Sequence, residues 1–292
     1  MSEIKLTSIE GNSQMLDGGA MFGNAPRVMW EKWVPPDKEG RIPLACRSLL
    51  VEIDQTKILL EAGVGAFFEP KLAQRFGIQQ PETHLLLQNL NELDLQEEDI
   101  DYVILSHLHF DHAGGLMPSY NNLTSNPGLH FPNAKYIVGK LAWERAQNPH
   151  SRDRASFIPD MIQRLKDSQR LIIVDTPTLP ELFGEHVEFF LSHGHTPGQL
   201  LTRIKNNKQN IIFLGDLVPG APWVNLPISM GYDRFPELII DEKKKLYESM
   251  DQKNTLLFFT HDANYASAKL SKNEKGRWVA TDLKTNLIKF EL

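Results

Sequence analysis

Seven side chains that commonly bind metal ions follow short strand-like runs in this chain. The runs are residues 102–106, 187–191, 211–214 and 256–259. The candidate ligands that follow them are His107, His109, Asp111, His112, His195, Asp216 and His261. Proteins of the α/β class place their sites where strand ends gather at one edge of a sheet. Such a set can hold two metal ions, and two metal ions that share a water molecule favour hydrolysis.

The spacing His107-x-His109-x-Asp111-His112 has a direct physical interpretation. In an extended chain, alternate residues point to the same side, so the first three can line one side as the chain leaves the strand. His112 needs a change of direction, which Ala-Gly-Gly at 113–115 permits as a tight turn or a close helix start. Three nitrogens and one oxygen are too many for one tetrahedral ion with an open position, so two ions are predicted.

The three distant candidates are weaker when taken one by one. Residues 193–198 offer both His193 and His195, and either could be the ligand. Asp216 alone could be a turn residue, and His261 could merely cap a strand. They gain weight together because each follows an apolar run. The remaining histidines lie in polar or proline-flanked contexts and are interpreted as surface residues: His84, His130, His150 and His186.

The composition is that of an ordinary soluble globular protein, with 41% hydrophobic and 23% charged residues among 292. A net charge of −6 argues against a nucleic-acid partner, and the lysines at 243–245 are interpreted as one solvated helix face. The single Cys46 is expected to be a small buried residue in a reducing compartment. Residues 1–13 lack a signal-peptide pattern and no run could span a membrane, so a cytoplasmic location without membrane association is expected.

Strands dominate the expected elements, and helices fall between groups of strands. Besides the apolar runs, strands are expected at 4–10, 48–53, 57–60, 135–138, 171–174, 201–205 and 278–281, and helices at 69–76, 84–93, 141–147, 159–168 and 241–250. Because helices do not alternate one for one with strands, the pattern favours two mixed sheets over a (β/α)8 barrel or a doubly wound sheet. No Pro/Gly/Ser linker divides the chain, so one domain over 1–292 is expected, with a long loop at 15–36.

The ligand set resembles that of the binuclear metallo-β-lactamase superfamily, with all seven positions present in order. The resemblance implies an α/β fold in the form of an αβ/βα four-layer sandwich, in which two mixed β-sheets carry outer helices. It also implies how the ligands divide between the ions: His107, His109 and His195 on one, and Asp111, His112 and His261 on the other. Asp216 would bridge the two ions.

A narrower resemblance covers residues 15–23, the long stretch between His112 and His195, and residues 261–265, which are similar to the larger quorum-quenching lactonases. It implies that a metal-bridging hydroxide opens a lactone ring, with N-acyl-homoserine lactones as the first substrate class. Two divalent ions per chain are expected, zinc first, with iron, manganese or cobalt as alternatives. Smaller lactonases place a tyrosine where this chain has Pro219, and Tyr265 or Tyr232 could take its place.

Asp111 and Tyr265 are the predicted catalytic residues, since Asp111 could orient the hydroxide or carry a proton. Asp262 is either an acceptor for a ligand imidazole or an exposed turn residue. The apolar 15–36 segment must bury its surface by lining a pocket, by contacting a second subunit in a homodimer, or by covering the core. The predicted substrate-binding residues are Met21, Phe22 and Phe67, and core packing is an equal alternative for Phe67.

Two other functions remain open for a small-molecule substrate. The same site could hydrolyse a phosphotriester, as organophosphate hydrolases do, or a thioester, as glyoxalase II does. A glutathione thioester would require a cluster of Arg or Lys at the pocket mouth, and none is evident in the sequence. The third hypothesis is a metal-binding protein without hydrolytic activity, and an intact ligand set with an open coordination position argues against it.

Overall fold

The computed structural model describes residues 2–125 and 128–292. They form two compact units. Unit 1 comprises Met1–Gln14, Ala45–Asp175 and Ile288–Glu291, and unit 2 comprises Met15–Leu44, Thr176–Leu287 and Leu292. Each unit is therefore assembled from segments that are far apart in the sequence. A single domain over 1–292 remains a prediction.

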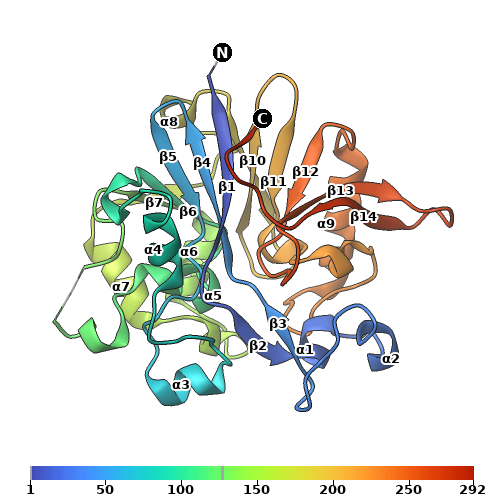
Figure 1. Ribbon diagram of the computed structural model, residues 1–292, viewed down its shortest axis with the longest axis horizontal. Coiled ribbons are helices and arrows are strands. Elements are labelled where there is room, and N and C mark those ends of the chain that lie inside the picture. Colours follow the sequence, from blue (N-terminus) through green and yellow to red (C-terminus); the bar gives the residue numbers. More distant parts are fainter. Residues whose placement is uncertain (1, 126–127) are drawn as a thin grey trace. The chain divides into compact units, whose positions relative to one another are not determined.

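Unit 1 is built on a seven-stranded mixed sheet, whose strands are drawn in blue to yellow-green in Figure 1 except for the C-terminal edge strand, which is red. In spatial order its strands are β15 (Phe290–Glu291), β1 (Ile4–Glu10), β4 (Arg47–Ile53), β5 (Thr56–Leu60), β6 (Tyr102–Leu105), β7 (Lys135–Gly139) and β8 (Leu171–Val174). The strands from β15 to β5 pair antiparallel, and those from β5 to β8 pair parallel. Parallel neighbours bring their carboxyl ends to the same edge of the sheet, where the first group of candidate ligands begins.

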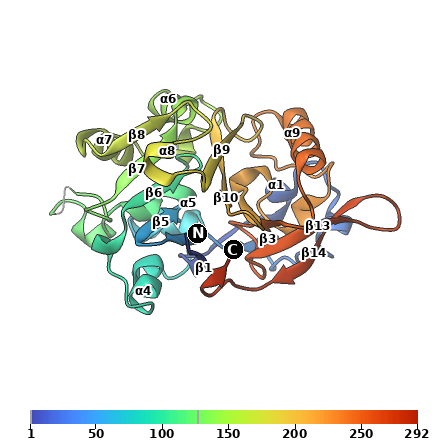
Figure 2. The ribbon, with the colours of Figure 1, turned by 90° about the horizontal axis from the view of Figure 1, so that it is seen from above.

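Short helices connect the parallel strands of unit 1. They are α3 (Pro70–Arg75), α4 (Leu85–Asn91), α5 (Phe110–Ala113), α6 (Lys140–Gln147) and α7 (Pro159–Asp167), with 3₁₀ turns at η1 (Glu97–Asp99), η2 (Gly114–Leu116), η3 (Tyr120–Asn122) and η4 (Arg154–Ser156). Figure 2 shows α6 and α7 beside β7 and β8. Helix α7 buries Met161, Ile162 and Leu165 on one face, the spacing of an amphipathic helix.

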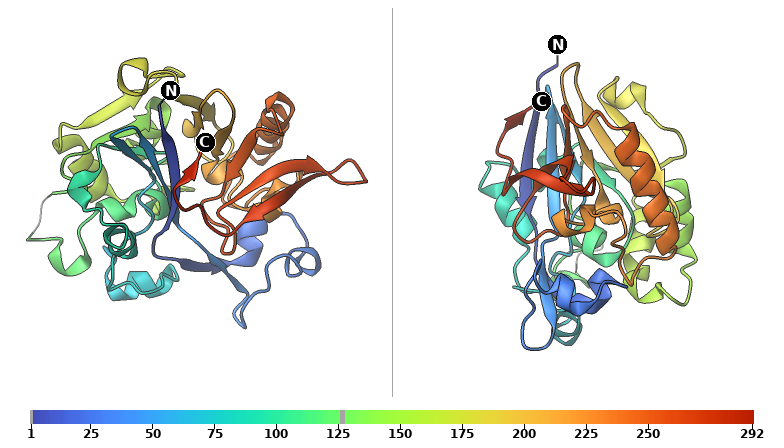
Figure 3. Two further views of the ribbon diagram at one scale, coloured as in Figure 1. Left: turned by 45° about the horizontal axis from the view of Figure 1, so that its top comes forward. Right: turned by 90° about the vertical axis from the view of Figure 1, so that its right-hand side faces the viewer.

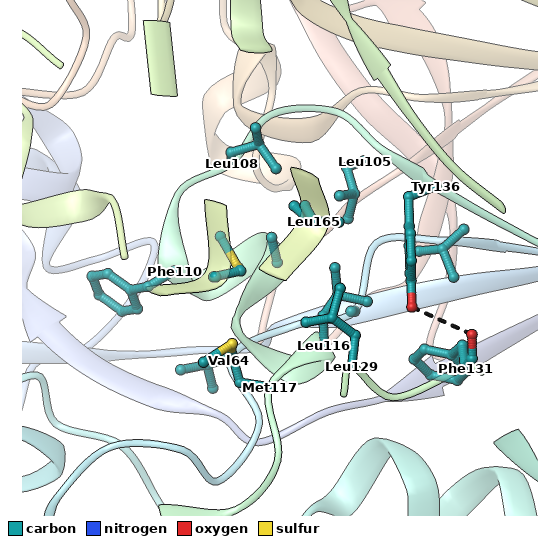
Figure 4. Close-up of a cluster of buried hydrophobic side chains, with 14 of the residues drawn as sticks. Val64, Leu105, Leu108, Phe110, Leu116, Met117, Leu129, Phe131, Tyr136 and Leu165 are labelled. Atoms are coloured by element: carbon teal, nitrogen blue, oxygen red, sulfur yellow. Dashed lines mark hydrogen bonds between the residues drawn. The ribbon is translucent and has the colours of Figure 1, made fainter. Parts of the chain in front are cut away.

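The core of unit 1 lies directly behind residues 107–115, which carry the first candidate ligands and are called the metal-binding loop below. Leu105 ends β6, just before the His/Asp cluster, and Leu116 and Met117 follow the cluster. All three side chains are buried together with Leu165 of α7 (Figure 4). The hydroxyl of Tyr136 donates a hydrogen bond to the carbonyl oxygen of Phe131 at 3.3 Å, so the polar atom in this cluster is satisfied. Apolar packing on both sides of the loop therefore restricts the positions of the ligands between them.

Unit 2 is built on a six-stranded mixed sheet. Its strands, in spatial order, are β14 (Trp278–Lys284), β13 (Ser267–Lys272), β12 (Thr255–Phe258), β11 (Asn210–Phe213), β10 (Gln199–Lys205) and β9 (Val187–Ser192). Only the β11–β12 pair of this sheet is parallel. A separate two-stranded sheet pairs β2 (Gln14–Asp17) with β3 (Arg41–Leu44). The predicted pair of mixed sheets is confirmed.

The helices of unit 2 are α1 (Gly18–Phe22), α2 (Arg27–Trp30), α8 (Pro180–Phe183) and α9 (Pro236–Ser249), with 3₁₀ turns η5 (Gly215–Leu217) and η6 (Ala221–Val224). Helix α9, in orange, runs along one face of the sheet (Figure 3). It starts at a proline, whose fixed φ suits the first helical position. Its buried residues follow the spacing of one face: Ile239, Lys243, Leu246 and Tyr247.

Several expectations from the sequence are wrong in detail. Residues 15–36 do not form one long loop, because they contain most of β2 and both α1 and α2, which are too short to show a helical period. Lys243 does not lie on a solvated face, because its side chain is fully buried. The final helix begins at Pro236 rather than at residue 241, and β13 and the short β3 and β15 were not expected. Cys46 is buried, as predicted. Within the described ranges, no helix is long and apolar enough to cross a membrane.

Candidate metal centre

The first group of candidate ligands follows β6 in unit 1. The rings of His107 and His109 approach with Nε2 and Nδ1 2.9 Å apart, and the ring centroids of His107 and His112 are 4.0 Å apart. The chain stays extended only to His109, since α5 begins at the next residue. Asp111 therefore lies in a helical turn, not in the extended segment that the spacing predicted. This turn brings His112 back toward His107.

Glu61, which the sequence analysis missed, holds His112 in unit 1. Leu60 pairs with Ile104 in the parallel β5–β6 ladder, so the residues that follow the two strands lie side by side. The carboxylate of Glu61 accepts a hydrogen bond from the backbone N–H of Ser106 at 2.8 Å and contacts Nδ1 of His112. Glu61, His107 and His112 together offer atoms close enough to surround one ion. An acidic residue directly after the apolar run 57–60 was the available signal.

Asp111 is oriented by Gln14, a fully buried side chain. Oδ2 of Asp111 accepts a hydrogen bond from Nε2 of Gln14 at 2.9 Å, and Oδ1 of Asp111 lies 3.8 Å from Nε2 of His112. An amide donor on one carboxylate oxygen fixes the direction in which the other oxygen points. Gln14 was also missed, because a glutamine in a polar stretch carries no signal of its own.

Gly115 allows the metal-binding loop to press against the segment that follows β5. Its N–H donates to the carbonyl oxygen of Gly63 at 2.9 Å, and the N–H of Ala62 donates to the carbonyl oxygen of His112 at 2.8 Å. A Cβ atom at position 115 would come within 2.0 Å of the carbonyl oxygen of Ala62. The Gly-Gly pair therefore serves close approach of two backbones.

The second group of candidate ligands, in unit 2, shares one offset from three strands. His195, Asp216 and His261 each stand three residues after the last residue of β9, β11 and β12. Phe213 and Phe258, which end β11 and β12, are paired in register, and β9 runs in the same direction as these two strands. Equal offsets from strands of one direction bring the three side chains to one edge of the sheet.

The three side chains of unit 2 are in direct contact. Oδ2 of Asp216 lies 3.2 Å from Nε2 of His195, and Oδ1 lies 3.1 Å from Nε2 of His261. Nδ1 of His195 lies 2.9 Å from Oδ1 of Asp233, whose other oxygen accepts the N–H of Met230 at 2.7 Å. Asp233 is buried and was missed, since it lies 38 residues from His195 with no motif between them.

This geometry fits a bound cation. If Nδ1–H of His195 donates to Asp233, then Nε2 presents a lone pair toward the carboxylate of Asp216. The lone pair on Nε2 of His195 and the lone pairs on Oδ2 of Asp216, 3.2 Å away, repel each other unless a cation lies beside both atoms. A carboxylate that orients the imidazole from behind is the usual support of a metal-binding histidine. The nitrogen and oxygen donors suit zinc and other divalent ions of its row.

The structure also decides among the open alternatives in unit 2. Nδ1 of His193 accepts a hydrogen bond from the N–H of Gly198 at 3.1 Å, so His195 is the histidine that meets Asp216. Asp262 is buried rather than exposed, and its carboxylate accepts hydrogen bonds from the backbone N–H groups of Ala221, Asn264 and Tyr265. Asp262 therefore shapes the turn that carries Tyr265.

A cavity of about 430 Å³ lies within unit 2 and reaches His261. Tyr265 lines it, whereas Tyr232 does not and is 44% exposed. Three indole side chains form much of its remaining wall: Trp33, Trp223 and Trp278. A concave, mostly apolar space beside titratable groups is the usual form of a small-molecule site.

The predicted substrate-binding residues are all buried in the cores of their own units. Phe22 stacks on Trp223 with a centroid distance of 4.4 Å, and Met21 accepts a hydrogen bond from the Trp223 indole through its carbonyl oxygen. Both therefore support a residue of the cavity wall without lining the cavity. Phe67 lies against Gly114, next to the metal-binding loop. Direct contact of these residues with a substrate stays a prediction.

His84 is not the surface residue that the sequence suggested. Its Nδ1 accepts the N–H of Leu87 at the start of α4, and its Nε2 lies 2.8 Å from the carbonyl oxygen of Gly115. Burial, followed by the neighbouring ring of His130, lowers the pKa of His84 to about 4. His130 itself is paired with Glu97 through Nδ1. His84 is therefore a neutral side chain that ties α4 to the metal-binding loop.

We expect His84 to weaken unit 1 at mildly acidic pH. Its pKa is near 6.5 when unfolded and about 4 when folded, so the unfolded chain takes up the proton first and stability falls as pH drops from 6.5 to 4. Between pH 7 and pH 5 the loss is about 2 kcal/mol. His84→Asn keeps a capping side chain but cannot take up this proton. Between pH 7 and pH 5 its free energy of unfolding should therefore fall by about 2 kcal/mol less than that of the wild type, measured by urea titration of metal-free protein. The matched control is His150→Asn at an exposed site, and equal pH dependence of the two variants would refute the role.

The family model described as the metallo-beta-lactamase superfamily matches residues 41–261. The match covers most of the chain, so the protein belongs to this superfamily. Its fold class is thereby confirmed, and with it the resemblance drawn from the His/Asp motif. The protein is a metal-dependent hydrolase of this superfamily.

Two curated relatives of this chain are lactonases. An N-acyl homoserine lactonase of Bacillus thuringiensis is 24% identical over 250 residues, which cover 78% of this chain and 84% of the relative. A lactonase of the same name from Bacillus cereus is 25% identical, over 76% of this chain and 82% of its own.

Solved structures agree with this fold. A probable metal-dependent hydrolase from Staphylococcus aureus has a TM-score of 0.84 and 26% identity, with 96% of this chain and 97% of that chain covered. A dizinc quorum-quenching lactonase in complex with a product has a TM-score of 0.73 and 20% identity, with 96% and 95% covered. The identity to the second structure supports the fold alone.

Proposed function

We propose that this protein is a binuclear metal-dependent lactonase that opens the ring of N-acyl-homoserine lactones. The observation that carries the proposal is that both ligand groups contain an imidazole held by a buried carboxylate. Glu61 contacts Nδ1 of His112 in unit 1, and Asp233 contacts Nδ1 of His195 in unit 2. Such carboxylates raise the basicity of metal-binding histidines and fix their tautomers. The curated lactonase relatives support the choice of substrate.

We propose that the two groups together hold two ions. Asp216 would bridge the ions, since each of its oxygens already faces a different imidazole. The proposed ligands are His107, His109 and His195 for one ion, and Asp111, His112 and His261 for the other. Zinc is proposed first, as in the dizinc structural neighbour, with iron, manganese and cobalt as alternatives.

Two divalent ions, when bound, supply a hydroxide nucleophile at neutral pH and polarise the carbonyl of the substrate. The residues of this chain do the rest. Gln14 holds one carboxylate oxygen of Asp111. With the other oxygen, Asp111 orients the hydroxide or accepts a proton. The cavity beside His261 holds the group attached to the lactone and excludes water from it. Tyr265 lines the same cavity, where its hydroxyl would donate to the leaving oxygen.

We expect Tyr265→Phe to lower kcat on lactones by about a hundredfold, because general-acid assistance contributes factors of that order. The substitution keeps the ring and the turn built by Asp262, so metal content and KM should change little. Steady-state kinetics and metal analysis on one preparation check this. The control is Tyr232→Phe, which alters an exposed tyrosine. An unchanged kcat in Tyr265→Phe would show that the Tyr265 hydroxyl takes no part in the reaction.

Turnover against a substrate panel tests the proposed function. Metal-loaded protein is assayed on lactones of several acyl chain lengths, thioesters and phosphotriesters, with metal content measured on the same sample. Lactones are expected to be the best substrates by kcat/KM. If every lactone is inert and a phosphotriester or thioester turns over, the site performs the alternative hydrolysis. If nothing turns over in protein that carries two ions per chain, the lactonase proposal is wrong.

A further inference from the structure

The cavity in unit 2 has several aromatic side chains in its wall. Trp33, Trp223, Trp278 and Tyr265 all line it, together with His261. They come from separate segments: the stretch after α2, η6, the first residue of β14 and the turn after β12. Four aromatic side chains converge on a space of about 430 Å³. Their chemistry restricts what can bind beside His261.

Two of these rings are fixed by their neighbours. Trp223 stacks on Phe22 with an interplanar angle of 4°, and its Nε1–H donates to the carbonyl oxygen of Met21 at 2.8 Å. Trp278 packs edge-on against Tyr247 at 5.5 Å, and Nζ of Lys272 lies 4.4 Å from the indole centroid. A wall that is already ordered pays little entropy when a flat ligand docks on it.

One exposed cation also lines the cavity. Arg277 stands at the end of the β13–β14 hairpin turn, directly before Trp278. The turn is well defined, since Oδ1 of Asn273 accepts the N–H groups of Lys275 and Arg277, and the N–H of Asn273 donates to the carbonyl oxygen of Arg277. The backbone of Arg277 is thus held in place, and its guanidinium adds positive charge to the cavity wall.

These features decide between three kinds of ligand group. An unbranched alkyl chain would gain burial but nothing from the ring quadrupoles. A quaternary ammonium group would favour an aromatic cage, but Arg277 would repel it, and the Asp262 carboxylate in the same wall already accepts three backbone N–H groups. A flat aryl group can stack on or meet the rings edge-on, and an anionic substituent on it can pair with the guanidinium.

We propose that the cavity binds an aryl group of the substrate and that Arg277 pairs with an anionic substituent on that group. The inference rests on the proposed function, because His261 lies at the same wall and places the reacting lactone beside this group. The substrate class is therefore narrowed from acyl lactones in general to lactones with an aryl-bearing side group. Trp33 and Arg277 are the specificity-determining residues.

The test compares three lactones with the metal-loaded full chain: one with an alkyl side group, one with a phenyl group of similar size, and one with a carboxyphenyl group. We expect kcat/KM to rise about fivefold from alkyl to phenyl, since an aromatic pair contributes roughly this factor. The carboxyphenyl compound should gain about fivefold more. Trp33→Leu, at a 37% exposed site, should remove the first gain, and Arg277→Met only the second. Lys275→Met is the control on the same turn.

The outcomes separate this inference from the proposed function. Lactone turnover with no aryl preference, or equal effects of Trp33→Leu and Lys275→Met, would overturn the inference and leave the lactonase intact. If no lactone turns over, calorimetric titration of the ring-opened carboxyphenyl acid decides. Binding that is weakened in both Trp33→Leu and Arg277→Met, but not in Lys275→Met, supports the cavity while the lactonase fails. No binding to the wild-type protein overturns the inference as well.

Discussion

Asp216→Ala is expected to lose bound metal and hydrolytic activity together. The carboxylate of Asp216 lies within 3.2 Å of two imidazole nitrogens, one on each oxygen, so its removal would leave His195 and His261 without the anion between them. The loss of the charge that would bridge the two proposed ions should lower activity by about a hundredfold, the upper end of what loss of a metal's supporting groups costs. Metal analysis and kcat on the panel substrates are measured on the same purified sample.

Two further variants make this result specific. Asp241→Ala removes an exposed carboxylate from α9 and should keep both metal and activity. Asp216→Asn keeps the volume of the side chain and loses its charge, so it separates a missing ligand from a packing defect. If Asp216→Ala retains two ions per chain, Asp216 does not bridge them.

Lys243→Met is expected to destabilise the protein, although Lys243 belongs to a run of three lysines on α9. Nζ of Lys243 donates to the carbonyl oxygens of Trp223, Asn225, Leu226 and Ile228, at distances between 2.6 and 3.2 Å. The side chain is fully buried. Methionine fills similar space but removes this donor, and of the four carbonyl groups only that of Asn225 keeps a backbone partner among the described residues, the N–H of Ile228 at 3.0 Å. Leaving buried carbonyl groups unsatisfied costs roughly 1–3 kcal/mol each. Urea unfolding of both proteins measures the difference.

The same substitution should also disturb the cavity. Lys243 holds the segment of residues 223–228, which includes Trp223 and Asn225 of the cavity wall. Burial lowers the pKa of Lys243 to about 7, whereas the charge of Asp233 acts in the opposite direction. The neighbouring Lys244→Met, at an exposed position, is the matched control. If the two variants unfold at the same urea concentration, the carbonyl cage does not stabilise the fold.

The sequence was most informative where chemistry and local geometry coincide. The His107–His112 motif could be interpreted because an apolar strand directly precedes it, and the later ligands because each follows a strand at a short distance. It was least informative for Lys243, whose neighbours in sequence are also lysines. Three consecutive lysines resemble a solvated face, but the helical period turns only the first of them toward the core.

The sequence by itself determined the two mixed sheets and the superfamily and supplied the candidate metal ligands, because these depend on residue types and on short-range periodicity. The tertiary structure alone decided which groups hold those residues in place. The parallel pairing of β5 with β6 brings Glu61 to His112. Asp233 contacts His195 although it lies 38 residues further along the chain. Such contacts depend on strand register and chain reversal, which no local pattern encodes. The aromatic cavity beside His261 arises in the same way, from segments brought together only by folding.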